Sequence, residues 1–397
     1  MSIFRSVRET HLSHIDTTQS PGQIDIHLGA TAWSTAGRKL TPLNATSMKG
    51  IFEFRRHESD PKKDSLRWCF AKPNQPRPTN FNVDAGSGHT SVELQRYIVD
   101  EEDAVAKLRQ AGATIYKDDQ GGWVSEIVLP ETFDSKIAVH TIPDLRKLSS
   151  VVSYRADNEL VASLKGHQTI RSLRLRCQIP ADQLDHLTSS LPNLKTLGFH
   201  CKDLTTAYCS AIQKGKSISW LKIGGNKDNL SSLNNMKGIN FWKLSLTECE
   251  LNKESLHRIA DCLPNLTSLE IADCTLSPNA LSPLTRMAQL KNLDFSGKSI
   301  NDAQLMAIKS HSNVHIIEIS DTAVTNSSLN HILQNFPDVF SVGAENVAFD
   351  REIFKVIDSV PVDRQFSVTV SSSSISLKEV EDAGPEISAR IHVNRYR

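Results

Sequence analysis

Short apolar segments recur along this chain about every 24 residues. In each segment apolar residues alternate with polar ones, which is the period-two pattern of a β-strand with one buried face. A unit of this length cannot bury its own apolar face and must stack on its neighbours. The pattern therefore predicts a solenoid of about eleven repeats. The central residues of the eleven segments are Leu148, Leu173, Leu197, Leu221, Leu244, Leu269, Leu293, Ile317, Val342, Val368 and Ile391.

Within a repeat the residues follow L-x-x-L-x-L-x-x-(N/C/T), as in Ile218 to Asn226. This pattern is the leucine-rich-repeat signature. Its last position falls where the chain leaves the strand and its backbone groups need partners. We therefore expect a structural role for the side chains there, which are Asn226, Cys249, Cys274 and Thr322.

The second half of each repeat carries the capping residues of a helix. A Ser, Thr, Asn or Asp follows an apolar residue at an equivalent position, which suits an N-cap with a hydrophobic staple. The expected N-caps are Thr205, Asn252, Ser277, Asn301, Thr325 and Asp350. Pro278 follows Ser277 at the first helical position, where its missing N–H costs nothing. The predicted fold is α/β, a leucine-rich-repeat solenoid with a parallel concave sheet and a helical convex side.

Composition agrees with a folded globular protein: 39% of residues are hydrophobic, 23% are charged, and the formal net charge is zero. We see no apolar run near the roughly 18 to 20 residues that span a bilayer, and no signal peptide at the start. As written, the chain is expected in the cytoplasm without a membrane partner. A start farther upstream with a signal peptide would make it secreted.

Residues 1–100 do not follow the repeat. Alternating runs at Gln23–His27, Gly50–Phe54, Leu66–Phe70 and Thr90–Tyr97 are separated by Pro, Gly, Asn and Asp clusters, and they indicate antiparallel strands with turns.

Part of this region carries more specific motifs. They are the L-x-x-C-F-A strand from Leu66, the R-P-T-x-F turn at Arg77–Phe81 and the G-S-G-H loop at Gly86–His89. With these motifs the segment resembles the end of a small lipocalin-like β-barrel domain of unknown function, abundant in planctomycete bacteria. The family's first strands, with an early tryptophan, have no counterpart here. The resemblance thus implies an incomplete barrel, a partial lipocalin-like domain over residues 1–100.

Residues 101–132 suggest an amphipathic helix, a strand, a Gly-Gly turn and a second strand, in which Ile127 and Leu129 supply a half-repeat. This segment resembles the entry to planctomycete-type leucine-rich-repeat arrays, which implies an N-terminal cap over 101–132 and a solenoid over 133–397. Lys298–Leu305 and Thr322–Leu329 resemble the 24-residue bacterial repeat type. Together these resemblances imply a bacterial, ribonuclease-inhibitor-like binding scaffold with no common activity.

Catalytic motifs are missing from the sequence. Gly86–His89 precedes a strand and lacks the helix N-terminus of a phosphate-binding loop. His200, His315 and His392 fall on concave positions of widely separated repeats, so they form no triad. The sequence contains no H-E-x-x-H, G-x-S-x-G or G-x-x-x-x-G-K-(S/T) motif. We expect no enzymatic activity, no cofactor and no metal.

Two of the seven cysteines, Cys177 and Cys201, take the same position in adjacent repeats. Neighbouring strands lie about 4.8 Å apart, so a disulfide or shared metal stays open, although further ligands at this depth are lacking and the expected compartment is reducing.

The concave face is the candidate site, because its strand positions are free of core packing. Basic residues and two tryptophans fall in the early repeats, and acidic residues fall in the later ones. The candidate contacts are Arg174, Arg176, Lys195, Trp220, Lys222, Trp242, Lys243, Glu270, Asp273, Asp294, Glu318 and Asp321.

These residues predict a non-catalytic scaffold that binds a protein partner of opposite polarity, with Trp220 and Trp242 as anchors. A solvated face whose two ends differ is the plain alternative. Small-ligand binding by residues 1–100 is a second function. Nucleic acid is not expected, because the acidic half would repel phosphate. Opposite poles also permit head-to-tail self-association.

Overall fold

The computed structural model describes residues 101–118, 122–228, 230–371 and 375–394 with their side chains, and the backbone of residues 99 and 100 and of seven short strands between residues 14 and 84. The chain divides into two compact units. One contains α1 (Val99–Gln110), most of α2 (Ser135–Thr141) and η3 (Ile142–Asp144), and the other contains residues 113–135 and those from 147 on. The domain boundaries expected at 100 and 132 stay a prediction.

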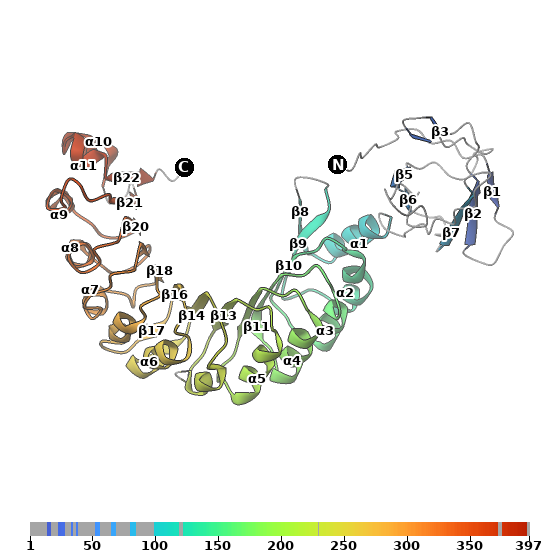
Figure 1. Ribbon diagram of the computed structural model, residues 1–397, viewed down its shortest axis with the longest axis horizontal. Coiled ribbons are helices and arrows are strands. Elements are labelled where there is room, and N and C mark those ends of the chain that lie inside the picture. The colour runs from blue at the N-terminus through green and yellow to red at the C-terminus, as the bar shows by residue number, and fades with distance from the viewer. Residues whose placement is uncertain are drawn as a thin grey trace. The chain divides into compact units, whose positions relative to one another are not determined.

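The second unit is built on one sheet of 13 strands. From β9 to β22 every neighbouring pair is parallel, and β8 (Thr114–Lys117) pairs antiparallel with β9 at one edge. The parallel strands are β9 (Val124–Leu129), β10 (Ser150–Ser153), β11 (Ser172–Gln178), β12 (Thr196–His200), β13 (Trp220–Gly224), β14 (Lys243–Thr247), β16 (Ser268–Ala272), β18 (Asn292–Ser296), β19 (Ile316–Glu318), β20 (Ser341–Ala344), β21 (Ser367–Ser371) and β22 (Ile391–Asn394). Within this unit the strands line the inner side of an arc and the helices its outer side (Figure 1).

The register of the sheet matches the predicted repeat at every core except the first. Leu173 aligns with Leu197, and the alignment continues strand by strand to Ile391. In β10, however, Val151 is the residue aligned with Leu173, whereas Leu148 lies before the strand. Leu148 is buried as the first leucine of the L-x-x-L motif, so the sequence placed this strand three residues too early.

Val151 also aligns with Ile127 of β9. The expected half-repeat therefore contributes a complete parallel strand, and the unit from β9 to β22 is a leucine-rich-repeat solenoid.

Helices follow most strands on the outer side. They are α3 (Asn158–Leu164), α4 (Ala181–Ser190), α5 (Thr206–Lys214), α6 (Lys253–Cys262), α7 (Asp302–Met306), α8 (Asn326–Asn335), α9 (Glu352–Asp358), α10 (Leu377–Asp382) and α11 (Pro385–Ser388), with the 3₁₀ helices η4 (Ser231–Met236) and η5 (Ser282–Arg286). The predicted caps Asn252, Asn301 and Thr325 accept hydrogen bonds from the first turns of α6, α7 and α8. Thr205 precedes α5, but its side chain makes no capping bond.

The helix expected after Ser277 is absent from this part of the structure. Asn279 adopts a left-handed backbone with φ of 57°, which stops a right-handed helix, and the chain forms a turn before η5. A smaller shift occurs after Asp350, which is not the N-cap itself. Its carboxylate accepts from the amide of Glu352, the first residue of α9, at 2.8 Å.

A buried polar column follows the strands, as the repeat motif predicts. The Asn226 side chain accepts from the Leu230 amide at 3.2 Å, and the Thr322 hydroxyl donates to the Ile319 carbonyl at 2.6 Å. The Cys249 thiol donates to the Thr247 carbonyl at 3.3 Å, and the Cys274 thiol donates to the Leu246 carbonyl at 3.4 Å. These side chains satisfy backbone groups where the chain turns out of the sheet.

Seven short strands precede the solenoid: β1 (His14–Asp16), β2 (Gln23–His27), β3 (Trp33–Ser34), β4 (Gly37–Arg38), β5 (Phe52–Arg55), β6 (Ser65–Trp68) and β7 (Asn80–Asp84). The predicted runs at β2, β5 and β6 form antiparallel pairs, β1–β2 and β5–β6. A further antiparallel pair, β3–β4, was not predicted, and β2 pairs parallel with β7. Up-and-down barrels are antiparallel throughout, so this pair departs from the lipocalin-like pattern. The expected strand at Thr90–Tyr97 and the loop at Gly86–His89 lie outside the described residues.

Candidate functional site

The concave face carries rows of side chains that run across the strands. The central row is formed by the polar position between the two buried residues of each strand, and the sheet register confirms its membership. It contains Arg174, Gly198, Lys222, Ser245, Glu270, Asp294, Glu318 and Gly343. Five of them, Arg174, Lys222, Glu270, Asp294 and Glu318, are among the contacts that the sequence predicts for the concave face.

Where basic and acidic residues meet, they pair with one another. Lys222 Nζ lies 3.3 Å from one carboxylate oxygen of Glu270, and Lys243 Nζ lies 3.0 Å from the other. The Ser245 hydroxyl donates to the same carboxylate at 2.7 Å. The side chains of Glu270 and Lys243 are only 16% and 17% exposed. Three predicted contacts, Lys222, Lys243 and Glu270, are thus largely occupied within the protein.

This network also holds Trp220. Its indole N–H donates to the Ser245 hydroxyl at 2.9 Å, and Lys243 Nζ lies 4.7 Å from the centre of its ring. Trp242 packs beside it, with ring centroids 6.1 Å apart and planes inclined by 57°. Trp220 is partly buried, whereas Trp242 is 46% exposed. The indole of Trp242 is therefore partly exposed to solvent, beside a Trp220 ring that is held by Ser245 and Lys243.

Beyond Glu270 the row is acidic. Burial and the charges of Glu270 and Glu318 raise the pKa of Asp294, while the pull of the lysines lowers it less. Burial also acts to raise the pKa of Glu270, but the bond from Ser245 and the two lysines outweigh it, and the net pKa is below its usual range. Neighbouring carboxylates in one row consequently have opposite pKa shifts.

The next strand makes room for Glu318. A Cβ atom on Gly343 would overlap the Glu318 carboxylate, so the glycine allows the acid to lie over β20. The Ser320 hydroxyl donates to the same carboxylate. Asp294 and Glu318 thus form a negative patch between β16 and β20.

The basic end of the face is partly neutralised as well. Arg174 pairs with Glu126 of β9 at 3.2 Å. The Arg176 guanidinium lies 5.4 Å from the centre of the Tyr154 ring, and it donates to the Tyr154 hydroxyl at 3.0 Å. Glu126 and Tyr154 were not predicted to belong to this surface. They could have been found by extending the register into the first two strands.

Trp242 and Lys195 lie just before their strands, in a second row that runs across the N-terminal ends of the strands. We call this row the rim row. Its members are Arg171, Lys195, Ser219, Trp242, Thr267, Lys291, His315 and Phe340, and each amide after Arg171 donates to the carbonyl of the preceding member. Phe340 is 48% exposed and occupies the position of Trp242, although it was not among the predicted contacts. The sequence had placed His315 on a concave strand position, but it belongs to this row, just before β19.

Asp273 and Asp321 lie past the other ends of their strands. Both adopt the left-handed conformation, with φ of 51° and 60°, as do Glu248 and Asn346 at equivalent positions. Aspartate and asparagine tolerate this conformation better than most residues, which gives these acids a role in the turn. Their assignment to the partner-binding surface stays a prediction.

The histidines form no catalytic group within the described residues. The His200 ring lies over Gly224, where a Cβ atom would come within 2.6 Å of Nε2, and burial lowers the pKa of this histidine. His392 lies on β22, far along the sheet from β12. Over the part of the chain that the structure describes, no three His, Cys, Asp or Glu residues are grouped to hold a metal ion.

Cys177 and Cys201 are both free thiols. The register shifts in β11 between Arg174 and Gln178, so Gln178 and not Cys177 aligns with β12. Burial raises the pKa of Cys177 to about 11 and that of Cys201 to about 12. The two cysteines therefore do not occupy the equivalent positions expected from spacing.

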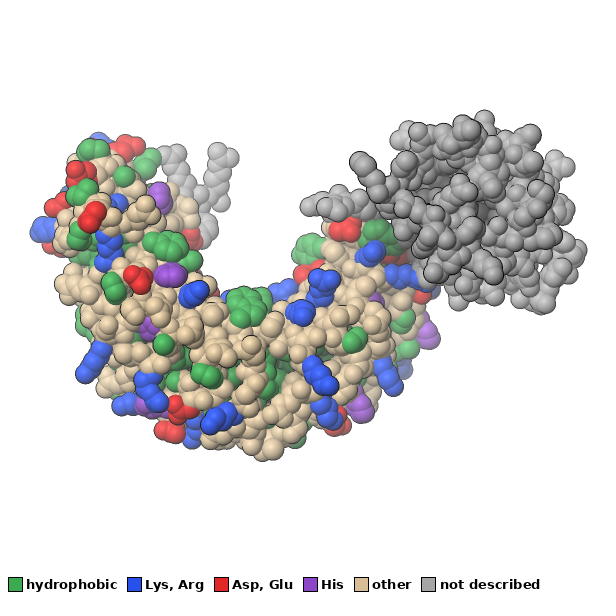
Figure 2. Space-filling view, in the orientation of Figure 1, with side chains coloured by type: hydrophobic (Ala, Val, Ile, Leu, Met, Phe, Trp, Pro, Cys, Tyr) green, Lys and Arg blue, Asp and Glu red, His purple; other side chains and the backbone are tan. Residues whose placement is uncertain are grey.

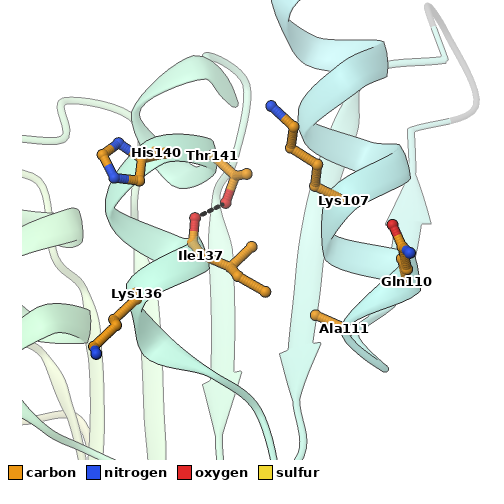
Figure 3. Close-up of a pocket in the computed structure, with 7 residues that line it drawn as sticks. All are labelled: Lys107, Gln110, Ala111, Lys136, Ile137, His140 and Thr141. Atoms are coloured by element: carbon orange, nitrogen blue, oxygen red, sulfur yellow. Dashed lines mark hydrogen bonds between the residues drawn. The ribbon is translucent and has the colours of Figure 1, made fainter.

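A cavity of about 620 Å³ lies between α1 and α2 (Figure 3). Its lining consists of Lys107, Gln110, Ala111, Lys136, Ile137, His140 and Thr141. Lys107 pairs with Asp103 at 2.8 Å, and the Thr141 hydroxyl donates to the Ile137 carbonyl at 2.8 Å. Among these lining residues there is no carboxylate to act with His140 as an acid–base pair.

No family model and no curated protein matches this chain. Among solved structures, TLR13 in its complex with ssRNA13 is similar with 18% identity and a TM-score of 0.38, over 64% of this chain and 36% of that one. An internalin from Listeria monocytogenes is similar with 13% identity and a TM-score of 0.38, over 75% of this chain and 91% of its own. Likenesses this distant carry no conclusion about function. Across the described residues, no helix has both the length and the apolar character needed to cross a bilayer.

Proposed function

We propose that this chain is a non-catalytic binding protein whose concave face and rim row hold a partner protein. The observation that carries the proposal is Trp242, an exposed indole beside the fixed ring of Trp220. Tryptophan is one of the residues enriched at the hot spots that dominate the binding energy of protein interfaces. An anchor that is already ordered loses little entropy on binding.

Charge supports the same surface. Lys195 and Arg171 are exposed at one end of the rim row, and Asp294 and Glu318 form the negative patch farther along. The ion pairs at Glu270 separate these two regions, so each can steer a partner group of opposite charge. Figure 2 shows basic side chains and hydrophobic side chains at intervals along the hollowed side of the solenoid.

The test is affinity capture from cell lysate with the intact chain, followed by mass spectrometry. Trp242→Ala is expected to reduce the captured partner by at least about tenfold, as loss of an interface anchor does. Met306→Ala is the matched control, since Met306 is an exposed apolar residue on α7, outside the sheet. Equal capture by Trp242→Ala and the intact chain would contradict the proposal, as would capture that nuclease treatment abolishes.

The second function expected from the sequence, small-ligand binding by residues 1–100, has no described side chain in its favour and stays a prediction.

A further inference from the structure

The rim row presents its side chains on a rigid frame. From Lys195 to Phe340 each amide donates to the carbonyl of the preceding member at 2.8–3.0 Å. The hydrogen-bonded strands therefore set the spacing of the side chains along the rim row, at about 4.8 Å from one strand to the next.

Two apolar sites stand on this frame, four strands apart. The first is Trp242 with Trp220. The second is Phe340, whose ring lies 5.9 Å from that of His315, together with Ile316 on β19, which is 39% exposed. Trp242, Ile316 and Phe340 are three of the large apolar side chains that are exposed among the described residues. Exposed apolar side chains that gather on one surface mark an interaction site.

Charged side chains alternate with the two apolar sites along the rim row. The exposed Lys195 lies two strands before Trp242. Between the two apolar sites the rim row carries the exposed Lys291, two strands beyond Trp242 and two before Phe340, whereas Asp294 and Glu318 belong to the central row. A chain that follows the rim row meets positive charge, an apolar site, positive charge and a second apolar site.

The distances match a single extended polypeptide. Four strand steps from Trp242 to Phe340 span about 19 Å, which equals about six residues of extended chain at about 3.3 Å each. Two steps from Lys195 to Trp242 span about 10 Å, or about three residues. A row one side chain wide suits one strand of chain better than a broad folded surface.

We propose that the occupant of the rim row is an extended segment of a partner protein in which an acidic residue, an apolar residue, a second acidic residue and a second apolar residue follow one another about every three positions. This inference rests on the proposed function and specifies the part of the partner that is recognised. The acidic residues pair with Lys195 and Lys291, and the apolar residues contact Trp242 and Phe340.

The experiment is selection of random 12-residue peptides displayed on phage against the intact immobilised chain, with Trp242→Ala/Phe340→Ala protein as the counter-selection. Enriched peptides are expected to share two apolar residues about six apart with an acidic residue between them. A labelled synthetic copy of one such peptide should bind at least about tenfold more weakly to either single variant, and Met306→Ala should leave its Kd unchanged. Thermal unfolding of each variant checks that it folds as the intact chain does.

The outcomes separate the two proposals. Weaker peptide binding after Trp242→Ala but not after Phe340→Ala would overturn the extended segment and leave the concave face as a binding surface. Peptides with no common spacing, or no enrichment over the counter-selected protein, would overturn it too, whatever the lysate capture finds. Binding of a second copy of this chain or of nucleic acid to the rim row, with no peptide selected, would replace the proposed occupant.

Discussion

At the scale of the residue, Asp294 is a carboxylate held in an unfavourable place. Its raised pKa means that its ionised form is less stable in the folded chain than in the unfolded one, so the penalty is present at neutral pH and disappears below the ordinary value of 3.8. Asp294→Asn should therefore raise the melting temperature at pH 7 by roughly 1–2 °C, with no gain near pH 3. Thermal unfolding across this pH range measures the effect, and an equal gain at both pH values would contradict it.

Glu270 is the opposite case. Its lowered pKa gives the folded chain stability that is present above the ordinary value of 4.5 and is lost as the pH falls through the folded pKa. Glu270→Gln leaves Lys222 and Lys243 facing each other and should cost about 1–2 kcal/mol at pH 7. The loss should shrink as the pH falls below the ordinary value of 4.5 and through the lower folded pKa. Urea unfolding of both proteins at pH 7 and pH 3.5 tests this, and a loss that grows in acid would contradict it.

Which residues share a row could be predicted from the sequence, whereas their pairing could not. The repeat period places Lys222 and Glu270 on one face, two strands apart. The two lysines pair with different carboxylate oxygens of Glu270, and this depends on side-chain rotamers that the repeat spacing does not determine. The period assigned Asp273 to the concave face, but it could not show that this residue adopts a left-handed conformation just past the end of β16.

At the scale of the element, helix starts depend on single caps. Asn252 and Ser255 form a reciprocal capping box at the start of α6, whereas Thr205 precedes α5 without a side-chain bond. Asn252→Ala should cost about 1 kcal/mol, and Thr205→Ala should cost much less. Equilibrium urea unfolding compares the two, and equal losses would show that the capping bond is not the cause.

The strand cores carry most of the sheet's stability. Leu221 and Leu269 are fully buried at equivalent positions of β13 and β16. Replacing either with alanine should destabilise the chain by roughly 2–5 kcal/mol, because a buried cavity is left behind. A loss below about 1 kcal/mol in urea unfolding would mean that the side chain is not packed as described.

The strands were predicted better than the segments between them. A period near 24 residues determines strand register. Among the eleven predicted strand centres only Leu148 was misplaced, because it is the first leucine of the L-x-x-L motif and Val151 is the residue inside the strand. The turn after Ser277 shows the limit, since Pro278 and a good N-cap favoured a helix that the left-handed Asn279 stops.

At the scale of the whole solenoid, we propose that the rim row beside Trp242 contacts a partner protein. Each repeat packs only on its neighbours. The exposed side chain that a repeat adds to the rim row can therefore contact a partner without changing the packing of distant repeats. Phe340 was missed because it lies in a repeat whose strand residues are small, although it occupies the same position as Trp242.

The most direct measurement is photo-crosslinking from Thr267, the rim-row neighbour of Trp242. A photoreactive amino acid placed at Thr267 in the intact chain, irradiated in cell lysate, should form a covalent adduct with a partner polypeptide. The same amino acid placed at Met306 on α7 should form none. Adducts at Met306 but not at Thr267, or no protein adduct at either position, would contradict the claim.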